Sequence, residues 1–256
     1  MYDYHAHSNY SDGRFLVEML VAAQRQGLEG IGFADHCNVS ADPSQRQFAR
    51  EFGFNLDLTH ERRRDAIESL RERYDLTIFD AVEMDYHPDD EAAIAEFLET
   101  AGFEYAIGSV HTVDGRNLHD EAYFGAKSRT ERRVVVETYV DRVVSLIDSE
   151  LFAIAGHVDL PQRNETLRGL FTDEHYRRIA SALEASRTVP ELNAGRVTDD
   201  YGQFHPGPDF REILAEHDVG FTLGTDAHTP ESVRENADEL AAFVDRWDID
   251  PVTVHE

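Results

Sequence analysis

The chain of 256 residues has very little cysteine, with Cys37 as its single example. One cysteine cannot form an intrachain disulfide, which is typical of a protein from a reducing compartment. The N-terminus has no basic segment followed by an apolar one, so no secretory signal peptide is predicted. No stretch approaches the ~20 apolar residues of a membrane span. These absences predict a cytoplasmic protein without a membrane partner.

Lysine is also nearly absent, since Lys127 is the only one and every other basic residue is arginine. Acidic side chains number 51 against 24 basic ones, so the formal net charge is −27. An acidic excess with arginine in place of lysine is typical of halophilic proteins, because salt screens the repulsion between carboxylates. The charge disfavours a nucleic-acid partner, since phosphate contacts supply most of that affinity. An acidic proteome would weaken this argument, so nucleic acid is not excluded.

The pattern of apolar residues predicts an α/β barrel. Short apolar runs alternate with longer segments of helical period, which is typical of parallel strands covered by helices. About seven such units predict a (β/α) barrel of the TIM type, as one domain over residues 1–256. An open doubly wound sheet is the alternative. The predicted strands are Asp3–His7, Gly30–Ala34, Thr77–Glu83, Tyr105–Val110, Phe152–His157, Val189–Asn193 and Gly220–Gly224. The predicted helices are Phe15–Gln26, Leu56–Tyr74, Asp89–Thr100, Thr130–Ile147, Thr172–Ser186, Asp209–Glu216 and Pro230–Val244.

Six of these seven strands end in a residue that can bind a metal ion. In a parallel barrel the carboxyl ends of the strands open on one face, where catalytic groups gather. Imidazoles and carboxylates bind zinc, iron or manganese, and a dense set without thiolates indicates an open hydrolytic site. The sixth strand offers only Asn193 and, further on, Arg196. The candidate ligands at the other ends are His5, His7, His36, Glu83, His111, His157, Asp226 and His228.

Three other features of the sequence lie away from the predicted strand ends. The long connection Asp42–Leu56 is a candidate lid or loop over the site. The run Arg62–Arg64 lies inside a predicted helix and is interpreted as a solvated face. His205, close in sequence to Arg196, stays a candidate site residue. The remaining histidines are predicted at the surface: His60, His87, His119, His175, His217 and His255.

The segments at the strand ends resemble the motifs of the polymerase and histidinol phosphatase (PHP) superfamily. His5–Gly13 is similar to its opening motif, Ala34–His36 to its second and Gly224–His228 to its last. Other segments resemble the monofunctional histidinol-phosphate phosphatases, and these are Glu83–Tyr86, Phe103–His111, Phe152–Leu160, Glu191–Arg196 and His205–Pro206. The resemblance implies a distorted seven-stranded barrel, in agreement with the strand count.

The resemblance also implies two or three divalent ions, which would be Zn, Mn or Fe. The implied ligands of the first ion are His5, His7, Glu83 and Asp226. Glu83 would bridge to a second ion that is also held by His111 and His157. Asp12, His36 and His228 would hold the third. Asp12 follows a serine in a loop and could instead be an ordinary cap residue. Cys37 is more readily a buried small side chain than a soft ligand.

The implied reaction is hydrolysis of a phosphate ester, with a metal-activated hydroxide as nucleophile. Glu83, Asp226 and His228 are the residues assigned to the catalytic step. Arg163 and Arg196 are candidates to bind the substrate phosphate, because the guanidinium fork suits its oxygens. The best substrate guess is a small phosphomonoester, L-histidinol phosphate.

Other functions remain open at this point. A PHP-type nuclease or a nucleotide phosphoesterase would use the same ions on a nucleic acid or a nucleoside bisphosphate. An amidohydrolase also begins with His-x-His, but Lys127 lies at no strand end and cannot supply a carboxylated lysine there. A PHP module without activity would be expected to have lost ligands, whereas this sequence retains them. The sequence does not predict an oligomeric state.

Overall fold

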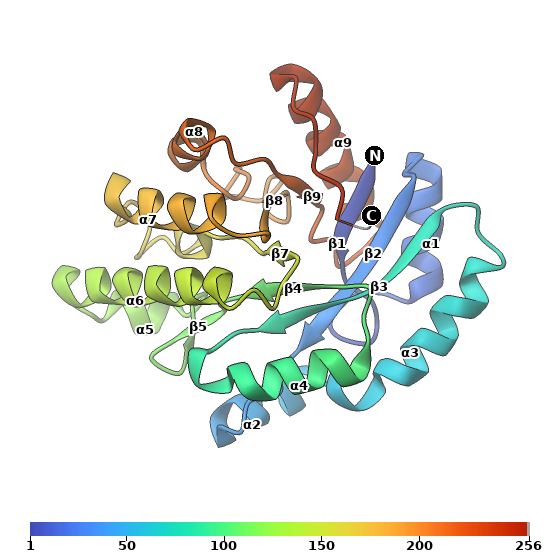
Figure 1. The fold of residues 1–256 in the computed structure, drawn as a ribbon, viewed down its shortest axis with the longest axis horizontal. Coiled ribbons are helices and arrows are strands. Elements are labelled where there is room, and N and C mark those ends of the chain that lie inside the picture. Colours follow the sequence, from blue (N-terminus) through green and yellow to red (C-terminus); the bar gives the residue numbers. More distant parts are fainter. Residues whose placement is uncertain (255–256) are drawn as a thin grey trace.

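A computed structural model describes residues 1–254, and its largest element is a parallel sheet of seven strands curved into a nearly closed barrel (Figure 1). The strand order along the sheet follows the order along the chain. The strands are β1 (Tyr2–Ala6), β2 (Gly30–Cys37), β3 (Thr77–Asp85), β4 (Tyr105–Ser109), β7 (Ile154–Ala155), β8 (Val189–Asn193) and β9 (Thr222–Gly224). Each predicted strand is present, and the prediction of a seven-stranded α/β barrel is confirmed.

The last strand returns to the first and brings the two ends of the sheet together. The amide of His7 donates to the carbonyl of Ala227 over 2.8 Å, and the amide of Asp226 donates to the carbonyl of His5 over 2.6 Å. The segment after β9 therefore lies against the carboxyl end of β1. This contact joins the two predicted ligand segments that are farthest apart in the sequence.

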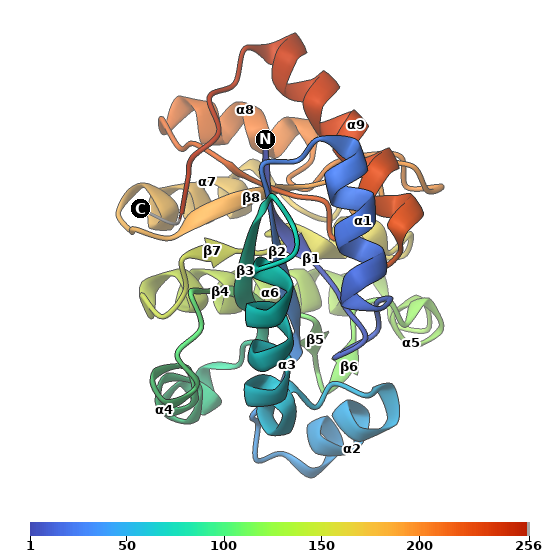
Figure 2. The ribbon, with the colours of Figure 1, turned by 90° about the vertical axis from the view of Figure 1, so that its right-hand side faces the viewer.

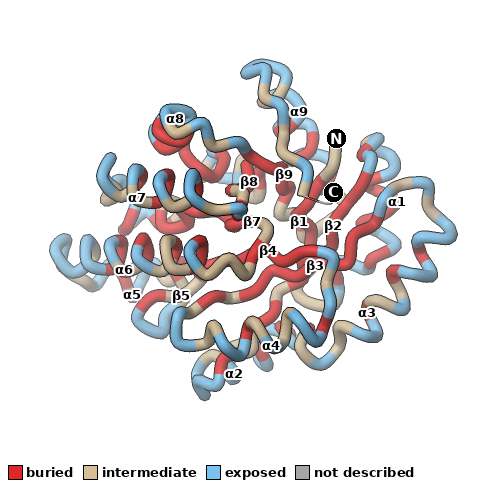
Figure 3. The backbone as a smooth tube through the Cα atoms, viewed as in Figure 1, coloured by how far each residue is buried: buried red, intermediate tan, exposed pale blue. Residues whose placement is uncertain are grey.

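Helices surround the strands, as Figure 2 shows from the side. The seven predicted helices are α1 (Leu16–Gln26), α3 (Leu56–Arg71), α4 (Glu91–Ala101), α6 (Arg129–Asp148), α7 (Asp173–Glu184), α8 (Pro208–Glu216) and α9 (Pro230–Trp247). Ser128, Thr172 and Thr229 begin three of them with capping boxes. Buried residues line the strands and the inner helix faces, whereas the outer helix faces are exposed (Figure 3). No helix of residues 1–254 combines the length and hydropathy that crossing a membrane requires.

Several elements were not predicted. Apart from the ten-residue helix within the candidate lid Asp42–Leu56, they are too short to have a periodic pattern. They are α2 (Pro43–Phe52), the 3-10 helix η1 (Pro88–Asp90), the hairpin β5 (Thr112–Val113) and β6 (Arg116–Asn117), α5 (Glu121–Gly125), and the 3-10 helix η2 (Leu160–Arg163). The candidate lid Asp42–Leu56 is thus mainly a helix rather than a loop. Asp42 caps it by accepting hydrogen bonds from the amides of Ser44 and Gln45.

An irregularity in β1 changes which side chains point into the barrel. Tyr4 packs with Phe79 of β3, while His5 lies 3.5 Å from Glu83 of the same strand. Phe79 and Glu83 share one face of β3, since they are four residues apart. Adjacent residues of β1 therefore both face the interior, which a regular strand does not allow. The register shift between Asp3 and Ala6 explains this, because a bulge re-aims the side chains that follow it.

The arginine run in α3 is not a solvated face, and that interpretation was wrong for Arg63. Its side chain is fully buried, and its guanidinium donates to Asp35 and Asp80, each over 2.7 Å. Asp35 in turn accepts bonds from Ser8 and Ser11. An isolated buried charge is costly, so the two carboxylates explain why an arginine is stable here. The result is a fixed anchor for the loop that follows β1.

Candidate metal centre

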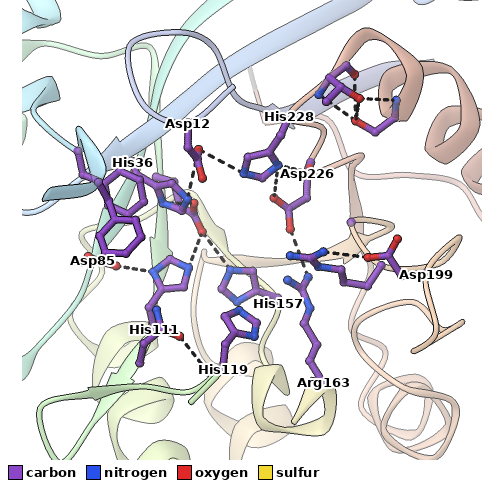
Figure 4. Close-up of a pocket in the computed structure, with 18 of the residues that line it drawn as sticks. Asp12, His36, Asp85, His111, His119, His157, Arg163, Asp199, Asp226 and His228 are labelled. Atoms are coloured by element: carbon purple, nitrogen blue, oxygen red, sulfur yellow. Dashed lines mark hydrogen bonds and ion pairs between the residues drawn. The ribbon is translucent and has the colours of Figure 1, made fainter. Parts of the chain in front are cut away.

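Seven of the nine predicted ligands line a cleft of about 480 Å³ at the carboxyl ends of the strands. His5 and His7 are fully buried and lie next to Glu83 and Asp226. Figure 4 shows that Asp12, His36, His111, His157, Asp226 and His228 converge on this cleft from different strands and loops. A cleft of this size suits a small ligand. All nine predicted ligand positions, Asp12 included, contribute to this cluster of imidazoles and carboxylates.

Glu83 lies at the centre of the cluster and presents its two oxygens to different imidazoles. Its Oε1 lies 3.0 Å from Nε2 of His157 and 3.3 Å from Nε2 of His111. Its Oε2 lies 2.8 Å from Nδ1 of His36 and 3.5 Å from Nε2 of His5. A carboxylate placed between two sets of nitrogens has the arrangement of a ligand that bridges two ions.

His5 and His7 point at a common space. Their Nε2 atoms are 3.1 Å apart, and Oδ1 of Asp226 lies 3.3 Å from Nε2 of His7. Two nitrogens bound to one zinc ion at about 2.1 Å in tetrahedral geometry lie about 3.4 Å apart. The spacing of His5 and His7 is within about 0.3 Å of this value, so both nitrogens can bind one ion.

Asp12 and His228, two of the implied ligands of a third ion, lie nearer the opening of the cleft. Oδ1 of Asp12 is 3.3 Å from Nε2 of His228 and 3.9 Å from both Nε2 of His36 and Nδ1 of His7. Asp12 is 38% exposed at its side chain, and His228 is 34% exposed. Both are therefore more accessible than Glu83, which is 1% exposed.

These side chains fit divalent ions. Three groups have ligand atoms that all lie within 4.8 Å of one another. In addition, the buried Nδ1 atoms of His7 and His157 have no hydrogen-bond partner among residues 1–254. The groups differ from the implied ligand sets in two ways: His7 also joins Asp12 and His36 also joins Glu83, while Asp226 and His157 belong to none of the three groups. The groups are His5–His7–Glu83, His36–Glu83–His111, and His7–Asp12–His36–His228.

Two buried carboxylates of the cluster are ionised despite their surroundings. Burial opposes the charge of Glu83, yet His36 and the other imidazoles around it hold its pKa well below the ordinary value. Burial likewise opposes the charge of Asp226, but His5 and Arg163 are among the groups that lower its pKa strongly. Negative charge at these positions is what a divalent cation requires.

The imidazoles of the cluster differ in charge. Burial disfavours the protonated form of His111, but the carboxylates of Glu83 and Asp85 outweigh it and raise the pKa to about 10. Burial and the neighbouring His228 lower the pKa of His7 to about 4. His7 is therefore a neutral ligand at neutral pH, whereas His111 must lose a proton before it binds a metal ion.

A second layer of carboxylates orients the imidazoles. Oε2 of Glu191, on β8, lies 2.8 Å from Nδ1 of His5, and Oε1 accepts from the amide of His157 over 2.9 Å. Asp85 pairs with Nδ1 of His111. Carboxylates at the second nitrogen of a histidine fix its ring and tautomer, as in many metal sites. The sixth strand thus contributes Glu191 rather than a direct ligand.

Backbone geometry also re-aims two of the ligands. His157 has φ of 26° and Asp226 has φ of 50°, in the left-handed region that few residues other than glycine adopt. Such strain persists where the surrounding structure enforces it, which is common at functional sites. Gly195 allows the close approach of Asp226, because a Cβ there would lie 2.4 Å from Oδ2 of that aspartate.

Both predicted arginines line the cleft, but in different ways. Arg163 is largely buried, and its Nη2 donates to Asn193 over 3.0 Å and to Asp226 over 3.2 Å. Arg196 is 48% exposed and pairs with Asp199 over 2.8 Å. Arg163 is therefore held in place beside Asp226 (Figure 4), whereas Arg196 is a more exposed residue of the cleft lining.

The aromatic residues of the α2 region form the apolar wall of the cleft. Phe48, Phe52 and Phe54 line it, and the ring of Phe54 stacks on His36 at 4.4 Å. Phe52 is 57% exposed. The candidate lid segment therefore does lie at the site, as expected. It supplies large rings next to an otherwise polar set of side chains.

Among the histidines predicted at the surface, His119 is exposed, as predicted, and it also lines the cleft, which was not predicted. The open question for His205 is also answered. It is fully buried and contacts Arg163 rather than Arg196. His60, His87, His175 and His217 are partly exposed and lie outside the cleft, and His255 lies outside the described residues.

Lys127 and Cys37 have no place in the centre. Lys127 pairs with Asp114 over 3.4 Å and does not line the cleft. This position agrees with the argument that the chain has no lysine that could be carboxylated to bridge two ions. Cys37 is buried in the core with Leu56 and Val82, as expected for a small apolar side chain.

Sequence reasoning missed the residues that support the ligands. Glu191, Asp85 and Asp159 all lie on or just beyond strands, in segments noted only for their resemblance. A signal was present in two of them, since Glu191 and Asp85 each lie two residues from another functional position on a strand, Asn193 and Glu83. Residues at i and i+2 point the same way, so both carboxylates could have been placed in the barrel.

Comparisons with known proteins agree with this geometry. A family model described as the PHP domain matches residues 3–194. A protein of Deinococcus radiodurans named "Probable histidinol-phosphatase" is 26% identical over 219 residues, which cover 84% of this chain and 81% of that protein. The crystal structure of histidinol phosphate phosphatase (HISK) from Lactococcus lactis, complexed with Zn, L-histidinol and phosphate, is similar with a TM-score of 0.80. It is 19% identical and is matched over 99% of this chain and 95% of that chain. The chain therefore belongs to the PHP family of phosphoesterases.

Proposed function

We propose that the protein is a metal-dependent phosphomonoesterase that hydrolyses L-histidinol phosphate to L-histidinol and phosphate. The observation that carries the proposal is the position of Glu83 between two sets of imidazoles, with Arg163 beside Asp226. The relatives named above support the choice of substrate.

Bound divalent ions would lower the pKa of water toward neutrality and neutralise charge on the phosphoryl oxygens. Glu83, His5, His7 and Asp226 would hold one ion, and Glu83 with His111 and His157 a second. Asp12, His36 and His228 would hold a third. We propose Zn, Mn or Fe for these positions, as two or three ions.

The protein's own side chains have distinct roles in this scheme. Arg163 and Arg196 bind the phosphoryl group, since guanidinium groups pair well with its oxygens. His228, which is exposed to the cleft, is the side chain proposed to give a proton to the leaving oxygen when no ion occupies its Nε2. Asp12 does not take this role because, despite its burial, His228 and the other imidazoles hold its pKa far below neutrality. Glu83 and Asp226 keep the centre negatively charged and so retain the cations.

The leaving group would lie against the apolar wall. Phe48, Phe52 and Phe54 offer ring faces that suit a flat group such as imidazole. A small cleft with one aromatic wall favours a small phosphomonoester over a polymer. A nucleic acid would need a cationic track, and the arginines that line the cleft are only Arg163 and Arg196 among the described residues.

The test is phosphate release by protein that is purified in high salt, stripped with a chelator and reloaded with Zn or Mn. L-histidinol phosphate would be compared with other phosphomonoesters, a nucleoside 3′,5′-bisphosphate and a short oligonucleotide. A kcat/KM of about 10⁴–10⁸ M⁻¹s⁻¹ for histidinol phosphate, well above the others, is expected. Preference for the bisphosphate or the oligonucleotide would instead support a nucleotide phosphoesterase or a nuclease.

We also infer that one domain spans the chain, that the protein works in the cytoplasm, and that this cytoplasm is salty. The net charge of −27 supports the last point. Raising KCl from 0.1 M to 1 M shortens the screening length from about 10 Å to about 3 Å, so the midpoint of thermal unfolding should rise. Equal stability and activity at both concentrations would contradict salt adaptation.

A further inference from the structure

Three side chains beside the metal centre form a connected row. Nδ1 of His205 lies 2.5 Å from Oδ1 of Asp159, and Nε of Arg163 donates to Nε2 of His205 over 2.8 Å. Asp159 immediately precedes η2, which ends at Arg163, while His205 lies between β8 and α8. The side chains of Asp159 and His205 are both fully buried. The row thus links two loops at the carboxyl end of the barrel.

The chemistry of the contacts assigns the protons. A guanidinium has only donors, so Nε2 of His205 must accept the bond from Arg163. The ring proton of His205 is then on Nδ1 and is donated to the carboxylate of Asp159. His205 is therefore a neutral imidazole with one fixed tautomer. Burial lowers the pKa of His205, in agreement with this assignment.

The partners of the row fix its position. Oδ2 of Asp159 accepts from the amide of Gly207 over 2.8 Å. The backbone of His205 pairs in both directions with that of Asn193, over 2.7 and 3.0 Å. The ring of Tyr201 stacks on that of His205 at 4.9 Å and 9°. The histidine therefore has very little freedom to move.

The guanidinium of Arg163 is consequently held along one of its edges. Its Nε is bound to His205, and its Nη2 to Asn193 and Asp226. Nη1 has no hydrogen-bond partner among residues 1–254, and Arg163 lines the cleft (Figure 4). An arginine free in solution loses much rotamer freedom when it binds a ligand, whereas one that is already fixed loses little.

We propose that Asp159 and His205 are positioning residues, which hold Arg163 with one guanidinium edge toward the cleft so that it binds a phosphate dianion. The inference rests on the proposed function, because it identifies how the phosphoryl group of substrate and product is recognised. Neither residue touches the reacting atoms, and both act through Arg163.

The experiment measures binding of inorganic phosphate to the metal-loaded protein by calorimetry, together with metal content. His205→Phe keeps a ring for Tyr201 but removes both hydrogen bonds, and it should weaken phosphate binding about 10-fold. His205→Gln retains an acceptor for Arg163 and should restore much of the affinity. Metal content should stay at the wild-type level in both. His217→Phe, at a partly exposed histidine outside the cleft, is the matched control and should leave phosphate binding unchanged.

A double-mutant cycle with Arg163→Ala separates positioning from a general structural role. If His205 acts through Arg163, His205→Phe should have no further effect on phosphate binding in the Arg163→Ala protein. Three results would overturn the proposal that Asp159 and His205 position Arg163. They are additive losses of phosphate affinity in the double variant, a loss of bound metal, or an unchanged phosphate affinity in the single variant. Wild-type protein that binds phosphate but does not hydrolyse histidinol phosphate would overturn the proposed function alone. Asp159→Asn provides a second variant if His205→Phe does not fold, and it should also weaken phosphate binding.

Discussion

The two ends of the barrel are filled from the same strands with opposite chemistry. At the amino end, the rings of Tyr4, Phe79 and Tyr105 pack with centroids 5.6 to 5.9 Å apart. At the carboxyl end, Glu83 lies among imidazoles. Phe79 and Glu83 belong to one face of one strand, four residues apart. Four residues along β3 thus separate an aromatic part that stabilises the fold from a charged part that binds metal ions.

The largest effect is expected at the charged end, from Glu83→Gln. The change keeps the size of the side chain but removes the charge that faces both groups of imidazoles. We expect loss of bound metal and a fall in kcat of about 10³-fold or more, equivalent to about 4 kcal/mol. Steady-state kinetics and elemental analysis of the purified variant measure both.

The control is Glu235→Gln, at an exposed position on α9. It should behave like the wild-type protein. Full metal content with normal kcat in Glu83→Gln would remove Glu83 from the centre and with it the bridging arrangement.

At the amino end, Phe79→Ala should act on stability instead. Its ring is 3% exposed and contacts those of Tyr4 and Tyr105. Loss of a buried ring of this kind costs about 3–5 kcal/mol, which urea unfolding would detect. The folded fraction should keep its KM and its metal content. A large change in KM at unchanged stability would mean that the two ends are not independent.

The charged end should also show a pH dependence of metal binding. The pKa of His111 in the metal-free protein is raised to about 10, so this imidazole is protonated at neutral pH. A metal ion must displace that proton, and its affinity therefore rises with pH and levels off only above about 10. Each displaced proton contributes about a 100-fold increase between pH 6.5 and 8.5. Because Glu191 and Glu83 outweigh burial and also raise the pKa of His5, we expect an increase of at least about 100-fold. Competition with a chelator of known affinity measures it, and a flat profile would rule out proton displacement.

A smaller effect is expected from Glu191→Gln, which changes the support of a ligand rather than a ligand. Its carboxylate accepts the proton of Nδ1 of His5, and loss of such a partner typically lowers metal affinity about 10–100-fold. Calorimetric titration with Zn would show whether affinity falls while the number of sites is retained. An affinity equal to that of the wild-type protein would mean that Glu191 only fills space.

Sequence reasoning predicted the barrel, and it predicted that the candidate ligand residues meet at one face, because both depend on local pattern. Apolar runs identify strands, and a residue after a strand end reaches the catalytic face whatever its partners are. The bulge in β1 could not be predicted in this way, since it depends on pairing with β2. For the same reason Arg63 looked like a solvated residue: its burial depends on Asp35 and Asp80 from other elements.

The central claim is that the strand ends hold a multinuclear metal centre with a phosphate site beside it. The most direct test is a crystal structure of protein loaded with Zn and soaked in phosphate, with anomalous data at the Zn edge. The account predicts two or three peaks around Glu83, and phosphate within hydrogen-bond distance of Arg163. A single peak away from Glu83, or none at full occupancy of added metal, would contradict it.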